Sequence, residues 1–263
     1  MPIPAEFRTA QGAPPLALVT GGAKRIGEAL ATALAEEGFR LAIHCHRSRG
    51  EADALAARLA AAGAPAPLVV QGDLAASDIA EHLFAQLPEP PVVLVNNASR
   101  FVEDRLEALD LGEWETHLAV NARAPALLIR AFAAALPAPA RGLVVNLSDA
   151  KLRSLNPDFF SYTVSKVALA GVTELAARAL APRIRVNAIA PAVTLVSGPQ
   201  SRENFAAAHV LNPLGRGVEV AHLVAALRYL LHTPSVTGET LTLDSGQRFL
   251  GLPRDVAYMV ERP

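Results

Sequence analysis

Tyr162 and Lys166 stand four residues apart, a spacing that places two side chains on one face of a helix. An unperturbed tyrosine ionises near pKa ~10, and a neighbouring ammonium group favours the phenolate. The spacing therefore predicts a proton-transfer pair in which Lys166 lowers the pKa of Tyr162 towards the neutral range. In isolation, the same spacing also fits a tyrosine and a lysine that share a solvent-exposed helix by chance.

A glycine-bearing turn near the N-terminus is the second chemical feature. The segment from Thr20 to Gly27 reads TGGAKRIG and runs directly into a helical pattern. Gly21 permits a tight turn and Gly27 permits close helix–sheet packing, while the helix N-terminus favours phosphate groups. We expect a dinucleotide pyrophosphate to bind here, through Gly21, Lys24, Arg25, Ile26 and Gly27. Alone, the turn also fits an ordinary strand-to-helix connection with a solvated lysine and arginine.

The second predicted strand ends in His44-Cys45-His46-Arg47-Ser48, which contains donors and no carboxylate. Proteins that bind NADH commonly place an acidic residue here for the ribose hydroxyls, whereas a 2′-phosphate needs positive charge and donors. His46, Arg47 and Ser48 supply both, so the sequence favours NADPH. The alternative is a metal pair, since His44 and His46 share a strand face. No third ligand follows at a recognisable spacing, and we predict no metal site.

Polar residues also follow the third and fourth predicted strands. Asp73-Leu74 comes after the third strand, and Asn97-Ala98-Ser99 comes after the fourth. Ligands of open α/β sheets bind at the carboxyl ends of the strands, so we expect both segments to contact the cofactor. Asp73 by itself fits a helix N-cap equally well.

The elements that must position these residues alternate along the chain. Short apolar runs are followed by Ala- and Leu-rich stretches of helical periodicity, such as Ile26–Glu37. The predicted strands are Leu16–Thr20, Leu41–Cys45, Leu68–Gln71, Val92–Asn96, Leu143–Leu147, Ile184–Ile189 and Thr240–Leu243. The alternation predicts an α/β fold: a single Rossmann-type domain over residues 16–263, with a doubly wound, parallel, seven-stranded sheet and helices on both faces. Residues 1–15 are expected to form a flexible arm.

Composition excludes several function classes. The chain has 263 residues, half of them apolar, and a formal net charge of -1, which gives no basic face for nucleic acid. The single cysteine, Cys45, has no partner for an internal disulfide. We recognised no secretory signal and no uninterrupted apolar run of the roughly 20 residues that a membrane span needs. A cytoplasmic protein without a membrane partner is expected.

Five motifs together resemble the ordered motifs of short-chain dehydrogenases/reductases. They are the turn from Thr20 to Gly27, Asn96-Asn97-Ala98, Asn121, Tyr162-x-x-x-Lys166 and Pro191. The resemblance covers nearly the whole chain. It implies that Tyr162 and Lys166 are catalytic, that Lys166 also holds the nicotinamide ribose, and that the backbone of Asn121 holds a proton-relay water. The cofactor would further contact Ala98, Ser99, Pro191, Val193 and Thr194.

The same resemblance implies a homotetramer and a substrate-covering loop. Apolar helical stretches around Leu127 and Leu169 are compatible with the tetramer. The loop would lie between Thr194 and Leu211 and be mobile without ligand. One departure from the family pattern is Asp244-Ser245-Gly246, where relatives commonly have Asp-Gly-Gly.

A second departure bears on the chemistry. Most family members have a serine about thirteen residues before the catalytic tyrosine, where it hydrogen-bonds a substrate carbonyl. Here Asp149 occupies that spacing and Ser148 precedes it. A carboxyl group can protonate a ring nitrogen, or bind the N–H edge of a heterocycle when ionised; neither task suits a simple ketone. The alternative is a loop residue that caps the next helix.

An aspartate at this position resembles the pattern found in pteridine reductases, the subgroup that reduces pterins and folates. Arg25 in its turn, the segment His46-Arg47-Ser48, and Asn97-Ala98-Ser99 followed by Phe101 resemble the motifs of that subgroup. The resemblance implies that Phe101 stacks on a flat pterin, that Ser99 contacts substrate, and that Arg25 serves cofactor phosphates or substrate. From sequence alone, Phe101 fits core packing equally well.

The resulting hypothesis is NADPH-dependent reduction of a pterin-type substrate, a dihydropterin or dihydrofolate. Hydride would pass to a C=N carbon of the ring while Tyr162 or Asp149 protonates the adjacent nitrogen. Substrate contacts would come from Arg25, Ser99, Phe101, Asp149 and Tyr162. Two alternatives stay open: a carbonyl reductase for a ketone such as an oxoacyl substrate, and a nucleotide-binding regulator without turnover.

Overall fold

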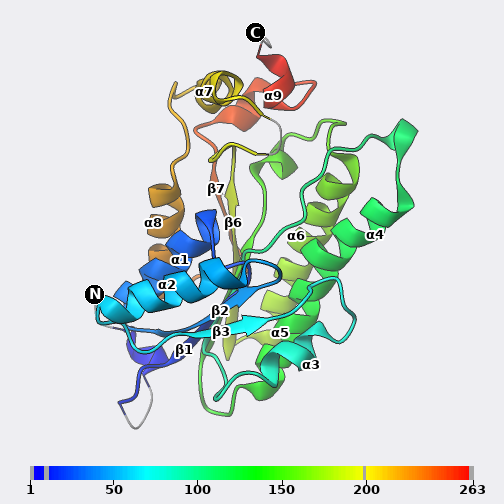
Figure 1. Cartoon of the computed structure of the whole chain (residues 1–263). Coiled ribbons are helices and arrows are strands. Elements are labelled where there is room, and N and C mark those ends of the chain that lie inside the picture. The colour runs from blue at the N-terminus through cyan, green and yellow to red at the C-terminus, as the bar shows by residue number, and fades with distance from the viewer. Residues whose placement is uncertain (1–2, 9–11, 198–199, 261–263) are drawn as a thin grey trace.

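The computed structural model describes residues 3–8, 12–197 and 200–260. Its strands pair in one parallel sheet of seven, in the order β3-β2-β1-β4-β5-β6-β7, with helices on both faces (Figure 1). The strands are β1 (Leu16–Val19), β2 (Arg40–Cys45), β3 (Leu68–Gln71), β4 (Val93–Asn96), β5 (Gly142–Leu147), β6 (Ile184–Pro191) and β7 (Thr240–Leu243). The Rossmann-type domain predicted from the sequence is confirmed, and the predicted strand ends agree to within two residues.

Two apolar cores lie on the two faces of the sheet. Ala17 and Val19 face the core formed with α1 (Arg25–Glu36), α2 (Arg49–Ala61) and α8 (Val220–His232). Leu16 and Leu18 face the core on the opposite side. That second core is formed with α3 (Ile79–Phe84), α5 (Ala124–Ala135) and α6 (Phe160–Leu180). Since both faces are buried, the strands read as continuous apolar runs, and each buried Leu or Val contributes roughly 1.5–3 kcal/mol.

The chain order reverses beside β1, which has β2 on one side and β4 on the other. Ligands of open α/β sheets bind outside the carboxyl ends of the strands at such a reversal. In Figure 1, α7 (Arg202–Val210) and α9 (Val256–Met259) lie above the upper ends of β6 and β7. α4 (Leu111–Leu118) packs beside α6. The fold therefore leaves one end of the sheet for a ligand site.

Part of residues 1–15, which were expected to form a flexible arm, contacts the domain. A short 3-10 helix, Ala5–Phe7, packs on the domain, and Phe7 is 2% exposed, with its ring 6.1 Å from that of Phe39. Glu6 forms an ion pair of 2.9 Å with Arg185. Burial of a whole phenyl ring outweighs the conformational freedom of a short arm. Ala5–Phe7 thus packs on the domain, while residues 1, 2 and 9–11 lie outside the described residues, and the flexibility of the arm stays a prediction.

Two expectations, one about the segment after β6 and one about Leu169, are corrected. The segment from Thr194 to Leu211, expected as a loop, contains α7, whose first turn is capped by the Ser201 hydroxyl accepting from Asn204 N. Its expected mobility includes residues 198–199, which lie outside the described residues, and stays a prediction. Leu169, cited for a subunit interface, is 1% exposed and belongs to the monomer core, whereas Leu127 is partly exposed.

One stretch meets the length and hydropathy of a membrane span. The continuous helix Leu111–Ala135, comprising α4, a π-helical turn and α5, has a mean hydropathy of 1.3 in its most apolar window, which is 44% buried. The helix contains charged residues, so it is not an uninterrupted apolar run in the sequence. Its residues pack against α3 and α6, as those of a core helix do.

Candidate active site

A cavity of about 820 Å³ opens at the carboxyl ends of the strands. Its volume suits a ligand-binding pocket. Predicted site residues that line it are Arg25, Ile26, Asn97, Ser99, Phe101, Asp149, Tyr162, Lys166, Pro191, Val193 and Thr194. Predicted residues outside its lining are Gly21, Lys24, Gly27, His46, Arg47, Ser48, Asp73, Leu74, Ala98 and Asn121. The structure thus brings the predicted catalytic and substrate residues, apart from Asn121, into one cavity.

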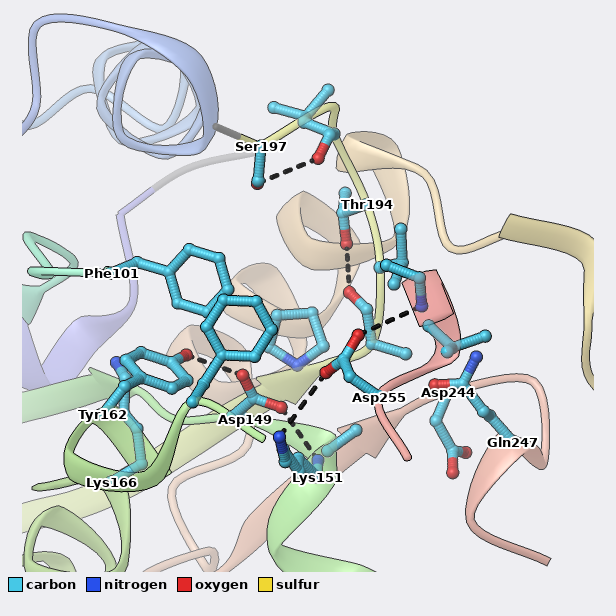
Figure 2. A pocket seen from close by; sticks show the side chains of 18 of the residues that line it. Phe101, Asp149, Lys151, Tyr162, Lys166, Thr194, Ser197, Asp244, Gln247 and Asp255 are labelled. Atoms are coloured by element: carbon cyan, nitrogen blue, oxygen red, sulfur yellow. Dashed lines mark hydrogen bonds and ion pairs between the residues drawn. The ribbon is translucent and has the colours of Figure 1, made fainter. Parts of the chain in front are cut away.

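Tyr162 and Asp149 are joined directly. The Tyr162 hydroxyl donates to Asp149 Oδ2 over 2.6 Å, as Figure 2 shows. Asp149 also has the capping role considered above, since its Oδ1 accepts from Lys151 N over 2.8 Å. The cap fixes the carboxylate while its second oxygen faces the phenol. The capping interpretation is therefore confirmed, whereas the chemical role of Asp149 stays a prediction.

The protonation state differs from the expectation that Lys166 lowers the pKa of Tyr162. Burial, with the neighbouring Asp149 carboxylate, raises the pKa of Tyr162 well above its ordinary value. Burial also raises the pKa of Asp149 and lowers that of Lys166 to about 8. Lys166 Nζ donates to Leu147 O over 2.7 Å and lies 5.6 Å from the centre of the Tyr162 ring. In this state the phenol is a protonated donor rather than a phenolate.

Asn121 lies in the π-helical turn Ala119–Arg123 between α4 and α5. Its side-chain oxygen accepts from Ser99 Oγ over 3.1 Å and from Arg100 N over 2.8 Å. Its amide nitrogen donates to Arg100 O and to Ser165 Oγ, each over 2.9 Å. The side chain is thus a satisfied buried amide that ties the loop after β4 to the helix of Tyr162. The predicted role of its backbone stays a prediction.

An aromatic row runs along the cavity from Tyr162. The Phe101 ring meets Tyr162 edge-on at 4.7 Å and stacks on Phe159 at 4.5 Å with an 18° tilt. Phe159 in turn stacks on Tyr258, at 6.2 Å and 14°. Phe101 is 42% exposed and lines the cavity, so core packing does not account for it. Its position suits a platform for a flat ring.

The turn after β1 has the geometry that a phosphate group needs. Gly21 has φ +58°, a region that favours glycine, and a Cβ on Gly27 would lie 2.1 Å from Gly21 O. α1 therefore packs directly on the turn and directs its first N–H groups to the carboxyl end of the sheet. Arg25, where helix α1 begins, has φ +56° and donates from Nη2 to Val196 O over 2.8 Å. Its guanidinium thus reaches the segment before α7.

His44 supports this turn through two hydrogen bonds. Its Nδ1 accepts from Gly21 N, and its Nε2 donates to Gly72 O, both over 3.1 Å. These bonds require a neutral ring, and burial lowers the pKa of His44 to about 4. Both ring nitrogens are used, so His44 is not available as the partner of His46 in a metal pair. The residues described hold no group of three potential metal ligands.

The ends of β2 and β3 show where an adenosine phosphate could bind. Arg47 is exposed at the end of β2 and has no ion-pair partner among the described residues, and Ser48 follows at the start of α2. His46 Nε2 lies 3.8 Å from Asp73 Oδ2, and Asp73 Oδ1 accepts from Ala75 N over 2.9 Å. The side chain of Leu74 is 5% exposed, in the core. A 2′-phosphate would therefore meet an uncompensated guanidinium at this edge.

The residues after β4 stiffen the turn. Asn97 Nδ2 donates to Thr20 O over 2.9 Å and to Gly21 O over 3.0 Å. The Thr20 hydroxyl accepts from Asn97 N and Ala98 N. Together these bonds lock the ends of β1 and β4 to one another. The side-chain amide of Asn97 is thus engaged by the protein's own backbone.

Sequence reasoning missed several cavity residues, namely Lys151, Phe159, Asp255 and Tyr258. Phe159 stands three residues before Tyr162, so its proximity was a usable signal. Asp255 and Tyr258 follow Tyr162 by most of a hundred residues, and no local pattern marks them. Figure 2 shows Asp255 beside Lys151, with Asp149 close by. Only the tertiary structure brings the C-terminal segment to the cavity.

A doubly wound parallel sheet, with a phosphate-type turn and a tyrosine–lysine helix at its reversal, defines a dinucleotide-dependent oxidoreductase. The family model described as Enoyl-(Acyl carrier protein) reductase matches residues 21–248. The chain belongs to the short-chain dehydrogenase/reductase family and is an NADP-dependent reductase.

Individual relatives refine this picture. Pteridine reductase 1 of Leishmania tarentolae is 35% identical over 69% of this chain and 77% of its own. A 3-oxoacyl-[acyl-carrier-protein] reductase of Synechocystis is 29% identical over 88% and 96%. The solved structure of FolM alternative dihydrofolate reductase 1 of Brucella canis, complexed with NADP, has a TM-score of 0.86 and 43% identity, covering 94% and 97% of the two chains. The Brucella suis protein in complex with NADP has a TM-score of 0.84 and 44% identity, covering 90% and 95%.

Proposed function

We propose that this protein reduces a C=N bond of a pterin-type substrate, a dihydropterin or dihydrofolate, with NADPH. The observation that carries the proposal is the 2.6 Å hydrogen bond between Tyr162 and Asp149, set beside the partly exposed ring of Phe101. A nitrogen acceptor needs a proton donor, and a flat heterocycle needs an aromatic surface. The similarity to pteridine reductase 1 and to the alternative dihydrofolate reductases agrees with this chemistry.

The cofactor would be held from the turn after β1 to the end of β6. Gly21, Gly27 and the first N–H groups of α1 would hold the pyrophosphate, and Arg47 with Ser48 would hold the 2′-phosphate. When bound, NADPH supplies the hydride that reduces the ring carbon. The open backbone turn and the uncompensated guanidinium both suit such a group.

Tyr162 would deliver the proton to the ring nitrogen adjacent to the reduced carbon. Its raised pKa keeps the phenol protonated through the neutral range, so the group is ready as an acid. Asp149 accepts the phenol hydrogen bond and, because burial raises its own pKa, can hold a proton for the same transfer. Lys166 faces the Tyr162 ring and favours any negative charge that develops on the phenol oxygen.

Substrate orientation would come from three further residues. Phe101 would stack against the flat ring, and Ser99 would contact its polar edge from the loop after β4. Arg25 lines the same cavity and reaches the segment before α7. Its guanidinium could serve substrate or cofactor phosphate after release from Val196 O.

Reduction of a ketone is the second candidate, supported by the similarity to 3-oxoacyl-[acyl-carrier-protein] reductases. A carboxylate held by Lys151 N occupies the position beside the phenol, and it repels the negative charge that develops on a carbonyl oxygen. The Tyr162–Asp149 pair therefore favours the pterin. A nucleotide-binding regulator that catalyses no reaction would not need the Tyr162–Asp149 hydrogen bond.

The test follows NADPH absorbance with purified protein and a panel of dihydropterins, dihydrofolate and ketones, including a short 3-oxoacyl thioester. We expect turnover with the dihydropterin compounds and at most trace turnover with ketones. Faster turnover of the ketones would favour the carbonyl-reductase alternative. Binding of NADPH without turnover of any compound would favour the regulator.

Assembly and location belong to the same proposal. A homotetramer is proposed from the family resemblance, with Val167 and Leu175 on the exposed side of α6, at 48% and 68% exposure, as candidate interface residues. Light scattering of the purified protein tests it, and a monomeric mass would contradict it. A cytoplasmic location, without nucleic acid or membrane partners, completes the proposal.

A further inference from the structure

The far end of the cavity is built by the C-terminal segment. Val256, Ala257 and Tyr258 line the same cavity as Tyr162, although they come from the last described helix, α9. Tyr258 is also the last ring of the aromatic row that begins at Tyr162 and passes through Phe101 and Phe159. A single wall of rings thus connects the proton donor to the C-terminal segment.

A buried carboxylate holds this segment in place. Asp158 is 2% exposed, and Arg254 Nε donates to both of its oxygens, over 2.8 and 2.9 Å. Arg254 Nη2 adds a bond of 2.7 Å to Asp158 Oδ1, and Asp255 N adds one of 2.7 Å to Oδ2. Asn204 of α7 donates to Ala257 O over 2.9 Å. A paired, fully bonded carboxylate is a rigid anchor, so the wall is formed before any ligand enters.

The spacing of the rings differs along the row. Phe101 and Phe159 lie 4.5 Å apart, which leaves little of their facing surfaces open. Phe159 and Tyr258 lie 6.2 Å apart at 14°, and the Arg254 guanidinium lies over the Tyr258 ring, 5.1 Å from its centre. With Phe159 and Arg254 against its ring, Tyr258 meets a ligand in the cavity mainly through its ring edge, which suits the face of another aromatic ring.

The charged groups at this end are already paired with one another. Arg254 is held by Asp158, and Lys151 Nζ lies 3.5 Å from Asp255 Oδ2. Arg248 Nη1 is 2.6 Å from Asp244 Oδ1. The Tyr258 phenol is hydrogen-bonded to Glu103, and its pKa is raised by burial and by that bond. Since Arg254, Lys151 and Arg248 have carboxylate partners, the wall offers aromatic contacts rather than free positive charge.

We propose that Tyr258, together with Phe159, determines specificity by forming a subsite for a neutral aromatic group attached to the reducible ring. The benzoyl ring of a folate is a group of this kind, and its charged tail would extend into solvent. The proposal rests on the pterin reduction proposed above and adds which substituent the enzyme selects.

The experiment compares two substrates that share a dihydropterin ring. 7,8-Dihydrofolate carries an aromatic substituent, whereas 7,8-dihydrobiopterin carries a short hydroxyalkyl chain. In Tyr258→Ala we expect KM for dihydrofolate to rise roughly threefold to tenfold, the range of one aromatic pair contact, with KM for dihydrobiopterin nearly unchanged. Tyr258→Phe retains the ring and should restore most of the wild-type KM. Tyr229→Ala removes a tyrosine that is 49% exposed on α8, outside this cavity, and should change neither value.

Other outcomes overturn the proposal. Equal changes of KM for both substrates in Tyr258→Ala would show a general structural role, and no change in either would show that Tyr258 does not contact the substituent. Thermal unfolding is measured alongside, and if Tyr258→Ala is unstable, Tyr258→Leu keeps the bulk without the ring and carries the comparison. If the wild-type enzyme reduces dihydrobiopterin but not dihydrofolate, the proposed subsite is contradicted and the proposed function stands. If the wild-type enzyme reduces neither substrate, both the proposed function and the proposed subsite are contradicted.

Discussion

The carboxylate of Asp104 caps α6, the helix that carries Tyr162. Ser161 N donates to Asp104 Oδ1 over 3.0 Å and to Oδ2 over 3.3 Å, although Asp104 belongs to the loop after β4. The helix's own N-cap residue, Phe159, has φ 52° and supplies no side-chain bond. The position of Tyr162 therefore depends on a cap supplied from a distant loop.

Replacing Asp104 should affect stability and turnover together. We expect Asp104→Ala to lower the free energy of unfolding by about 1 kcal/mol and to lower kcat severalfold, because the first turn of α6 loses its acceptor. Asp110→Ala is the matched control, since Asp110 caps α4 by accepting from Glu113 N over 2.8 Å. It should cost similar stability and leave kcat unchanged. Equal kcat losses in the two variants would contradict a positioning role for Asp104.

Asp149→Ala should separate chemistry from cofactor binding. The variant loses the oxygen that faces the Tyr162 hydroxyl at 2.6 Å. We expect kcat for dihydropterin reduction to fall about 100-fold or more, as for loss of a positioned acid–base group, with the Kd for NADPH within about twofold. Steady-state kinetics and fluorescence titration of NADPH measure the two effects. Comparable losses in both would argue against a catalytic role.

Asp149→Asn should stabilise the protein at neutral pH. Burial raises the pKa of Asp149, so the folded state binds its proton more tightly than the unfolded state. The wild-type protein therefore loses stability as pH rises through the folded pKa, whereas an amide at this site does not titrate. We expect the variant to have the higher Tm at pH 7 and the difference to close as pH falls below the ordinary pKa of the carboxyl. A lower Tm at pH 7 would contradict it.

His44 should make the stability of the fold pH-dependent. The unfolded chain binds a proton at His44 near pH 6.5, whereas the folded chain does so only near pH 4. Stability is therefore fully present above pH 6.5 and is lost as pH falls towards 4, with a slope approaching ~1.4 kcal/mol per pH unit. His44→Gln keeps one acceptor for Gly21 N and one donor for Gly72 O without titrating. Denaturant unfolding at several pH values should show a flatter profile for this variant, and identical profiles would count against the prediction.

Arg47 should set the preference for NADPH over NADH. Charge-assisted contacts with the 2′-phosphate are worth about 1.5–3 kcal/mol, so Arg47→Ala should raise KM for NADPH roughly tenfold to 100-fold and leave KM for NADH unchanged. Arg49→Ala is the control, because Arg49 lies two residues further on and is paired with Asp53 at 2.9 Å. An equal effect of the two substitutions would show that only general positive charge matters.

The amino-acid sequence by itself determined the sheet and the order of its motifs. Continuous apolar runs separated by helical stretches allow few arrangements other than parallel strands covered on both faces. The sequence then predicts that the turn after β1 and the donors after β2 lie near each other, because the carboxyl ends of parallel strands meet at one edge. The spacing of the tyrosine and the lysine is read directly from the order of residues. The offset between Asp149 and Tyr162 was likewise readable, and the two side chains do meet.

Only the tertiary structure decided how these groups are protonated and what surrounds them. Spacing placed Lys166 near Tyr162, but burial and Asp149 control the pKa of the phenol, and a pattern does not show burial. The packing of Phe7, the burial of Leu169 and the meeting of Tyr258 with Phe159 depend on contacts between distant segments. Local periodicity indicates which face of a helix or strand is apolar. Which other element packs against that face is determined only when the whole chain folds.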